Sequence, residues 1–113
     1  MTPATRLLVI VTILIWTAPL ARADEHPGRP VFVKWCAPCH SRGPGNPGTA
    51  ALTAVYKNQK PGALEDRTDL TPEFVKKIVR NGVYVMPFFR KTEITDAELE
   101  ALAAYLAQPP ASE

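Results

Sequence analysis

Both cysteines of the chain lie within one short stretch, WCAPCHSRGPGNPG, at residues 35–48. Cys36 and Cys39 are separated by two residues, and His40 follows directly. Thiols and an imidazole at this spacing occur in redox-active dithiols, in zinc sites and at covalent cofactor attachment points. The stretch also contains the string G-x-G-x-x-G, which is typical of dinucleotide-binding loops. Each of these four kinds of site requires different residues elsewhere in the chain.

The surrounding sequence argues against three of the four. The glycine run at residues 43–48 lacks the preceding strand and following helix of a dinucleotide-binding βαβ unit, so we interpret it as a rigid turn. A thioredoxin-like dithiol would follow a buried strand, and no strand pattern precedes the cysteines. A zinc site needs four ligands, whereas this domain offers only Cys36, Cys39, His40 and the distant His26.

The remaining alternative is C-x-x-C-H, the attachment motif of c-type haem. Cys36 and Cys39 would lie about one helical turn apart. Both sulfurs could then form thioethers with the two vinyl groups of one porphyrin. His40, the next residue, would present its imidazole to the iron. This interpretation predicts a second axial ligand elsewhere in the chain.

Met86 is the best candidate for that second ligand. The sequence has two methionines, and Met1 lies in a segment that we expect to be removed. Met86 follows the predicted helix end at Gly82, and Pro87 restricts the backbone directly after Met86. A lone methionine is ordinarily a core residue, but beside a haem motif we predict that it binds the iron. His26 is the rival ligand. It lies just after the predicted cleavage site, where chain ends are usually mobile, so we favour Met86.

The N-terminus has the layout of a secretory signal peptide. A polar start at residues 1–6 precedes an apolar run at residues 7–20, and ARA at residues 21–23 forms an A-x-A cleavage site. The run is shorter than the roughly 20 apolar residues of a membrane-spanning helix. We therefore predict that residues 1–23 are cleaved and that residues 24–113 form one periplasmic domain with no membrane span, an uncleaved anchor being the alternative.

Removal of the signal peptide also removes the excess positive charge. The chain has 13 basic and 11 acidic residues. Arg6 and Arg22 fall in the predicted signal peptide and every acidic residue follows it, so the mature domain is formally neutral. Its charge gives no indication of nucleic-acid binding. A domain of about ninety residues has a modest core and often depends on a disulfide, metal or cofactor.

The sequence predicts helices and no convincing strand. The clearest helix is TPEFVKKIVRNG at residues 71–82, in which Thr71 suits the N-cap, Pro72 the first turn and Gly82 the end. Its apolar residues predict one buried side, and they are Phe74, Val75, Ile78 and Val79.

Three further helices are expected. An apolar segment, Arg29–Trp35, leads into the cysteine motif, and a short helix is expected over residues 49–56. The last helix begins with a capping box, Thr95 to Glu98, and continues to Gln108 before two prolines. The remaining residues read as long loops.

Taken together, these motifs resemble those of class I c-type cytochromes over the whole predicted mature chain. Gly28 and Phe32 precede Cys36 by eight and four residues. In that family such a glycine and aromatic pack the N-terminal helix across the C-terminal helix, for which Leu102 and Tyr105 have the right type and spacing. The resemblance implies an all-α fold of three to four helices, with long loops wrapped around one covalent haem.

The segment KIVRNGVYVMPFF is also similar to the small cytochrome subunits of p-cresol methylhydroxylase-like flavocytochromes. This second resemblance implies a flavoprotein as redox partner. In class I cytochromes a proline carbonyl accepts the imidazole N–H of the haem histidine. Pro44 and Pro47 lie closer to His40 than is usual for that proline, and we favour Pro47.

Histidine and methionine ligation would raise the reduction potential and fill both axial positions of the iron. We therefore predict an outer-sphere carrier of single electrons rather than an enzyme with catalytic residues. It would accept electrons from a dehydrogenase and pass them to a respiratory chain. The alternatives are a haem enzyme or gas sensor with a displaceable Met86, and a fixed subunit of a larger oxidoreductase.

Two further groups of residues complete the prediction. The expected walls of the haem pocket, each aromatic of which could equally be an ordinary core residue, are Phe32, Trp35, Ile78, Tyr84 and Phe88. Five basic residues could form a docking patch or simply a solvated helix face, and they are Lys76, Lys77, Arg80, Arg90 and Lys91.

Overall fold

The computed structural model describes residues 25–108, so the predicted signal peptide and the two prolines after Gln108 lie outside the described residues. In chain order the helices are α1 (Gly28–Trp35), α2 (Ala37–His40), α3 (Pro47–Val55), the short 3-10 helix η1 (Leu64–Asp66), α4 (Pro72–Asn81) and α5 (Asp96–Leu106). Over residues 25–108 the one strand-like pairing is an isolated bridge between Val83 and Met86. The predicted all-α fold is confirmed.

Local capping groups define both ends of α4 and the start of α5 as the sequence predicted. The Thr71 hydroxyl accepts a hydrogen bond from the Phe74 N–H at 3.2 Å, and Gly82, whose φ is +71°, is the C-cap that follows the last residue of α4. Thr95 and Glu98 form the expected capping box, with bonds of 2.8 and 3.2 Å. These groups satisfy N–H donors that a helix start leaves without partners.

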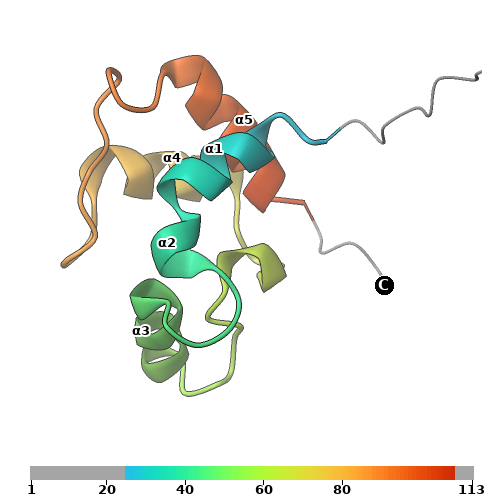
Figure 1. Ribbon diagram of the computed structural model, residues 1–113, viewed down its shortest axis with the longest axis vertical. Helices are drawn as coiled ribbons and strands as arrows, with labels where there is room; N and C mark the ends of the chain where they lie inside the picture. The colour runs from blue at the N-terminus through green and yellow to red at the C-terminus, as the bar shows by residue number, and fades with distance from the viewer. Residues whose placement is uncertain (1–24, 109–113) are drawn as a thin grey trace, which may run out of the picture.

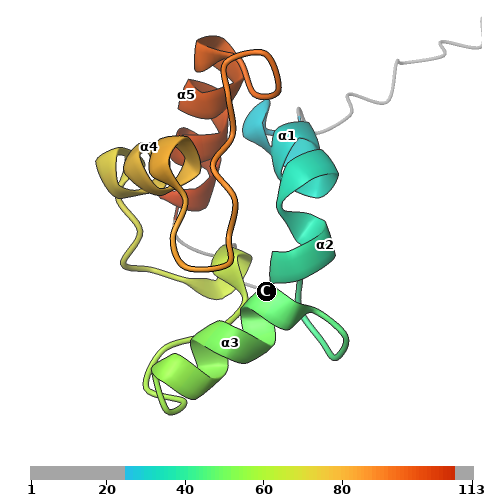
Figure 2. The same ribbon diagram turned by 90° about the vertical axis from the view of Figure 1, so that its left-hand side faces the viewer.

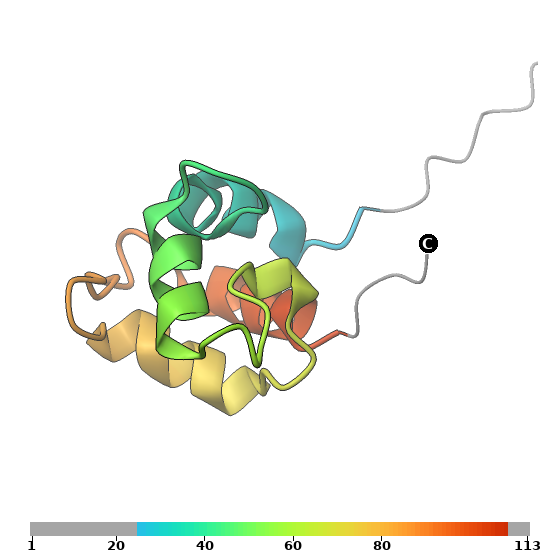
Figure 3. The same cartoon turned by 90° about the horizontal axis from the view of Figure 1, so that it is seen from below.

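Helices α1 and α5 cross in close contact, which is visible in two views (Figure 1 and Figure 3). A Cβ atom on Gly28 would lie 2.6 Å from the Cβ of Tyr105 and nearer still to the Ala101 carbonyl oxygen. The Phe32 ring lies 5.9 Å from the Tyr105 ring, and both Phe32 and Leu102 are buried. The crossing predicted from the family resemblance is confirmed.

The main apolar core lies where α1, α4 and α5 meet. It also includes Leu70 and Ile94, and its other members are Val31, Phe32, Cys36, Val75, Val79, Leu99, Leu102, Ala103 and Leu106. On α4 the predicted buried side is partly wrong, because Phe74 is 49% exposed and only Val75 and Val79 are fully buried. Successive helical residues are about 100° apart, so Phe74 is turned away from the face that packs on α5.

Helices α2 and α3 contribute little to this core, against which only Ala37 of α2 packs. Figure 2 shows α3 at the opposite end of the molecule from α5. Neither α2 nor α3 has a fully buried residue. Polar contacts join them instead, including a 2.7 Å hydrogen bond from the Thr49 hydroxyl to the Ser41 carbonyl. This end of the protein therefore has little apolar core of its own.

The connection between α3 and α4 contains a buried charge that the sequence did not suggest. Arg67 is 5% exposed and donates two hydrogen bonds to Asp69, at 2.6 and 2.8 Å. Its guanidinium lies 4.8 Å from the centre of the Tyr56 ring, and Lys60 also pairs with Asp69. Arg67 and Lys60 together lower the pKa of the Asp69 carboxyl. These contacts order a connection that reads as loop in the sequence.

The two ends of the described chain lie on the same side of the molecule (Figure 1 and Figure 3). Among the described residues, 25–108, there is no helix of the length and apolar character needed to cross a membrane.

Candidate functional site

The C-x-x-C-H motif lies on a single turn of helix at the junction of α1 and α2. Cys36 is both the C-cap of α1 and the N-cap of α2, and its carbonyl accepts hydrogen bonds from the N–H groups of Cys39 at 3.1 Å and His40 at 2.9 Å. Both cysteines are free thiols, Cys36 buried and Cys39 exposed. The structure therefore brings two unpaired thiols and one imidazole together on one turn of the chain.

The environment of Cys36 does not suit a redox-active dithiol. Burial, with a smaller contribution from Cys39, raises the pKa of the Cys36 thiol to about 12. Dithiol redox centres need a readily formed thiolate, which low-pKa cysteines provide. A zinc site is also unsupported, because residues 25–108 contain no cluster of three or more His, Cys, Asp or Glu side chains arranged to hold a metal.

The imidazole of His40 is held by close contact with Gly48. A Cβ atom on Gly48 would lie 2.6 Å from Cε1 and 2.7 Å from Nδ1 of His40. Nδ1 is buried, and the described residues offer it no hydrogen-bond partner. Since Gly48 covers the Nδ1 edge, Nε2 is the nitrogen that a metal could approach. Burial also lowers the pKa of His40, which favours the neutral imidazole that binds metals.

Gly48 is the site residue that sequence analysis missed. The sequence predicts Gly48 in the glycine turn at residues 43–48 and a helix that begins at residue 49, whereas the structure places Gly48 in the first turn of α3. Pro47 begins α3, as a proline often does. The predicted hydrogen bond from the His40 ring to the carbonyl of Pro47 or Pro44 is not found among the described atoms.

Met86 lies in a tight turn immediately after α4. The Val83 N–H bonds to the Met86 carbonyl at 3.1 Å, and the Met86 N–H bonds to the Val83 carbonyl at 2.9 Å. A Cβ atom on Gly82 would lie 2.7 Å from the Met86 oxygen, so the turn begins at a position with room only for glycine. Tyr84 and Val85 form its tip, which is fully exposed. Met86 itself is half-buried.

The five predicted pocket residues are in different environments. Phe32 is a core residue at the crossing of α1 and α5. Trp35 is half-buried with its ring edge-on to that of Phe89 at 5.7 Å, and Ile78 is also half-buried. Tyr84 and Phe88 are exposed, so neither is an ordinary core residue of the described chain. Contact of these side chains with a cofactor stays a prediction.

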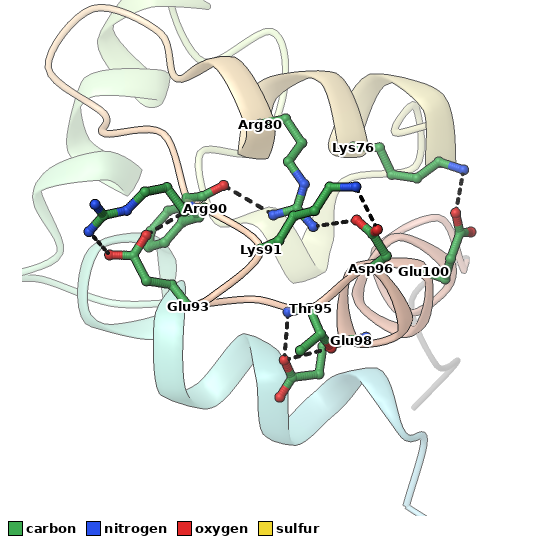
Figure 4. A network of polar contacts seen from close by, with 10 residues as sticks. Lys76, Arg80, Arg90, Lys91, Glu93, Thr95, Asp96, Glu98 and Glu100 are labelled. Carbon is green, nitrogen blue, oxygen red and sulfur yellow. Dashed lines mark hydrogen bonds and ion pairs between the residues drawn. The ribbon is translucent and has the colours of Figure 1, made fainter.

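Carboxylates neutralise most of the predicted basic patch, as Figure 4 shows. Lys76 pairs with Glu100 at 2.9 Å. Arg80 and Lys91 both pair with Asp96, at 2.9 and 2.8 Å, and Arg90 lies 3.5 Å from Glu93. This arrangement favours a solvated helix face over a docking patch.

The donor set fits a covalently attached haem. Two free thiols on one helical turn suit thioether formation, and a neutral imidazole with one covered edge suits axial ligation through the other nitrogen. Met86 is half-buried and carries a thioether, the group that binds iron opposite histidine in cytochromes c.

Comparisons with known proteins agree with this chemistry. A family model described as cytochrome c oxidase, cbb3-type, subunit III matches residues 23–106. Cytochrome c6 of Picosynechococcus sp. is 31% identical over 105 residues, which cover 92% of this chain and 89% of the relative. A comparison with solved structures gave no significant match. The chain therefore belongs to this cytochrome c family, as a class I c-type cytochrome and monohaem electron carrier with covalently bound haem c.

Proposed function

We propose that Cys36 and Cys39 attach the haem, and that His40 and Met86 are its axial ligands. The observation that carries this assignment is the turn of helix on which both thiols and the imidazole lie, with Gly48 fixing the imidazole edge. The assignment of Met86 is supported by its position in a turn that glycine and two hydrogen bonds constrain. His26 is less suitable, because its Nδ1 already accepts the Gly28 N–H at 3.0 Å.

With histidine and methionine as ligands, the iron has no open coordination site for a substrate. A bound haem supplies a one-electron couple, and a neutral thioether ligand raises its potential. The chain's own residues keep both ligands in place, so that a change of redox state needs little rearrangement. We therefore assign outer-sphere transfer of single electrons, with no catalytic residue.

We further propose that the protein works in the periplasm and accepts electrons from a flavoprotein dehydrogenase for delivery to a respiratory chain. The signal-peptide layout of residues 1–23 supports export. The similarity of the α4 and Met86 region to subunits of p-cresol methylhydroxylase-like flavocytochromes supports a flavoprotein donor. With a neutral mature chain and paired surface charges, docking should depend only weakly on long-range electrostatic steering.

The axial assignment can be tested with Met86→Ala. The variant should remain a folded haem protein, lose the near-infrared Met–Fe(III) absorption, bind cyanide or CO readily and have a lower reduction potential. Phe74→Ala is a suitable control, because Phe74 is half exposed on the helix that precedes the turn. An unchanged potential in Met86→Ala would rule out Met86 as the ligand.

A fixed subunit of a larger oxidoreductase is the second candidate. It is favoured by the description of the matching family as an oxidase subunit and by the exposed apolar tip at Tyr84 and Val85. Exposed apolar patches often mark contacts with other proteins. Purification from the native host without tags or high salt distinguishes the candidates, since a fixed subunit elutes with its partner and a free carrier elutes alone.

A further inference from the structure

Both ends of the Met86 segment, residues 82–89, are attached to the last turns of α4. At the entry, the Gly82 N–H bonds to the Ile78 carbonyl at 2.7 Å. At the exit, the Phe89 N–H bonds to the Val79 carbonyl at 2.8 Å. The Phe89 carbonyl accepts a 3.0 Å hydrogen bond from Nη1 of Arg80. Neighbouring residues of α4 therefore hold both backbone polar groups of Phe89.

Arg80 also connects this exit to α5. Its Nη2 donates to Oδ1 of Asp96 at 2.9 Å, while Lys91 pairs with the other carboxylate oxygen at 2.8 Å (Figure 4). Asp96 lies in the first turn of α5 and Arg80 in the last turn of α4, so each charge also suits its helix dipole. A planar guanidinium can donate to two acceptors in fixed directions, whereas an ammonium acts as a point charge.

Lys76 provides a comparison on the same pair of helices. It joins α4 to α5 through Glu100 at 2.9 Å, one helical turn before Arg80, and this ion pair does not involve the Met86 segment. Arg80 thus differs from Lys76 by its additional bond to the segment rather than by its charge or its partner helix.

We propose that Arg80 is a positioning residue that holds the Met86 segment against α4 and α5, and thereby limits how often the Met86 thioether leaves the iron. The inference rests on Met86 being the axial ligand. Surface loops open locally at low free-energy cost unless backbone contacts restrain them. Without Arg80, the Phe89 N–H bond to Val79 would be the remaining backbone bond at the exit of the segment.

The test is imidazole binding to the oxidised holoprotein, followed through loss of the near-infrared Met–Fe(III) band. Loss of one charged hydrogen bond should raise the apparent imidazole affinity of Arg80→Gln by about ten-fold. Lys76→Gln should bind imidazole like the wild type. Asp96→Asn, which keeps the Arg80 bond to Phe89, should give a smaller increase than Arg80→Gln. Equal imidazole affinities for Arg80→Gln and Lys76→Gln would overturn the proposal.

Amide hydrogen exchange separates this proposal from the axial assignment. In Arg80→Gln the Phe89 amide should exchange faster than in the wild type, while in Lys76→Gln it should not. If the wild type lacks the Met–Fe(III) band, the axial assignment fails, and the exchange result alone decides whether Arg80 holds the segment. Unchanged protection of Phe89 would then contradict the proposal. If Arg80→Gln does not mature, Arg80→Lys provides the same comparison.

Discussion

The position of the His40 imidazole is set by its contact with Gly48, a residue without a side chain. Gly48 lies against the Nδ1 edge of the ring, where any larger residue would overlap Cε1, Nδ1 and the Cys39 carbonyl oxygen. The orientation of the His40 imidazole, the proposed axial ligand, is therefore fixed by packing rather than by a hydrogen bond.

This packing predicts the effect of Gly48→Ala. In an exposed helix, such a change would stabilise the protein by roughly 0.5–1 kcal/mol. Here the added methyl group must displace the His40 ring or the first turn of α3, so we expect a loss of about 1–3 kcal/mol. Denaturant unfolding of the holoprotein measures this loss of stability. Ala51→Ser, at an exposed position of α3, is the control. Stabilisation by Gly48→Ala would show that the contact is unimportant.

At the scale of helices, the crossing of α1 and α5 depends on Gly28 in the same way. Its Cα faces the Ala101 carbonyl and Tyr105, so a methyl group would push the two helices apart. We expect Gly28→Ala to lower the free energy of unfolding by about 1–3 kcal/mol. Arg29→Ala, an exposed change on the same helix, should have a much smaller effect. If Gly28→Ala and Arg29→Ala lowered the stability equally in thermal or denaturant unfolding, that result would contradict a close crossing of α1 and α5.

The helices show what the sequence could predict. Both ends of α4 and the start of α5 were predictable, because Thr71, Gly82 and the Thr95–Glu98 capping box act on residues close to them in the sequence. The buried side of α4 was less predictable, because packing against α5 decides that Phe74 is exposed. Arg67 was missed because its burial depends on Tyr56, eleven residues earlier in the chain.

In the candidate site, too, some features follow from neighbouring residues in the sequence and others depend on tertiary packing. The proposed ligand set, which stays a prediction, rests on the C-x-x-C-H spacing and on the single methionine of the predicted mature chain. The contact between Gly48 and His40 and the bonds of Arg80 depend on how separate segments meet. These contacts therefore cannot be predicted from the spacing of residues along the sequence.

The whole molecule has two unequal parts. The meeting point of α1, α4 and α5 has an apolar core, whereas α2 and α3 have no fully buried residue. Because the C-x-x-C-H motif joins the two parts, a haem attached there, as we propose, would add apolar surface where the chain supplies little. Small domains often depend on such a cofactor for stability.

We therefore predict that the haem-free chain is largely unfolded, with any residual structure at the crossing of α1 and α5. Two-dimensional amide NMR of protein produced without haem attachment tests this. We expect poorly dispersed signals, and no slow amide exchange in α3. Well-dispersed signals that include α3 would show that the polypeptide folds without its cofactor.

The attachment of the Met86 segment has a consequence for how such carriers diversify. Its entry and exit both rest on the last turns of one helix, and its tip touches little else in the described protein. Residues between those two anchors can therefore change without rebuilding the helical scaffold. With Met86 as the proposed axial ligand, substitutions in this short segment are expected to shift the reduction potential while the helices stay in place.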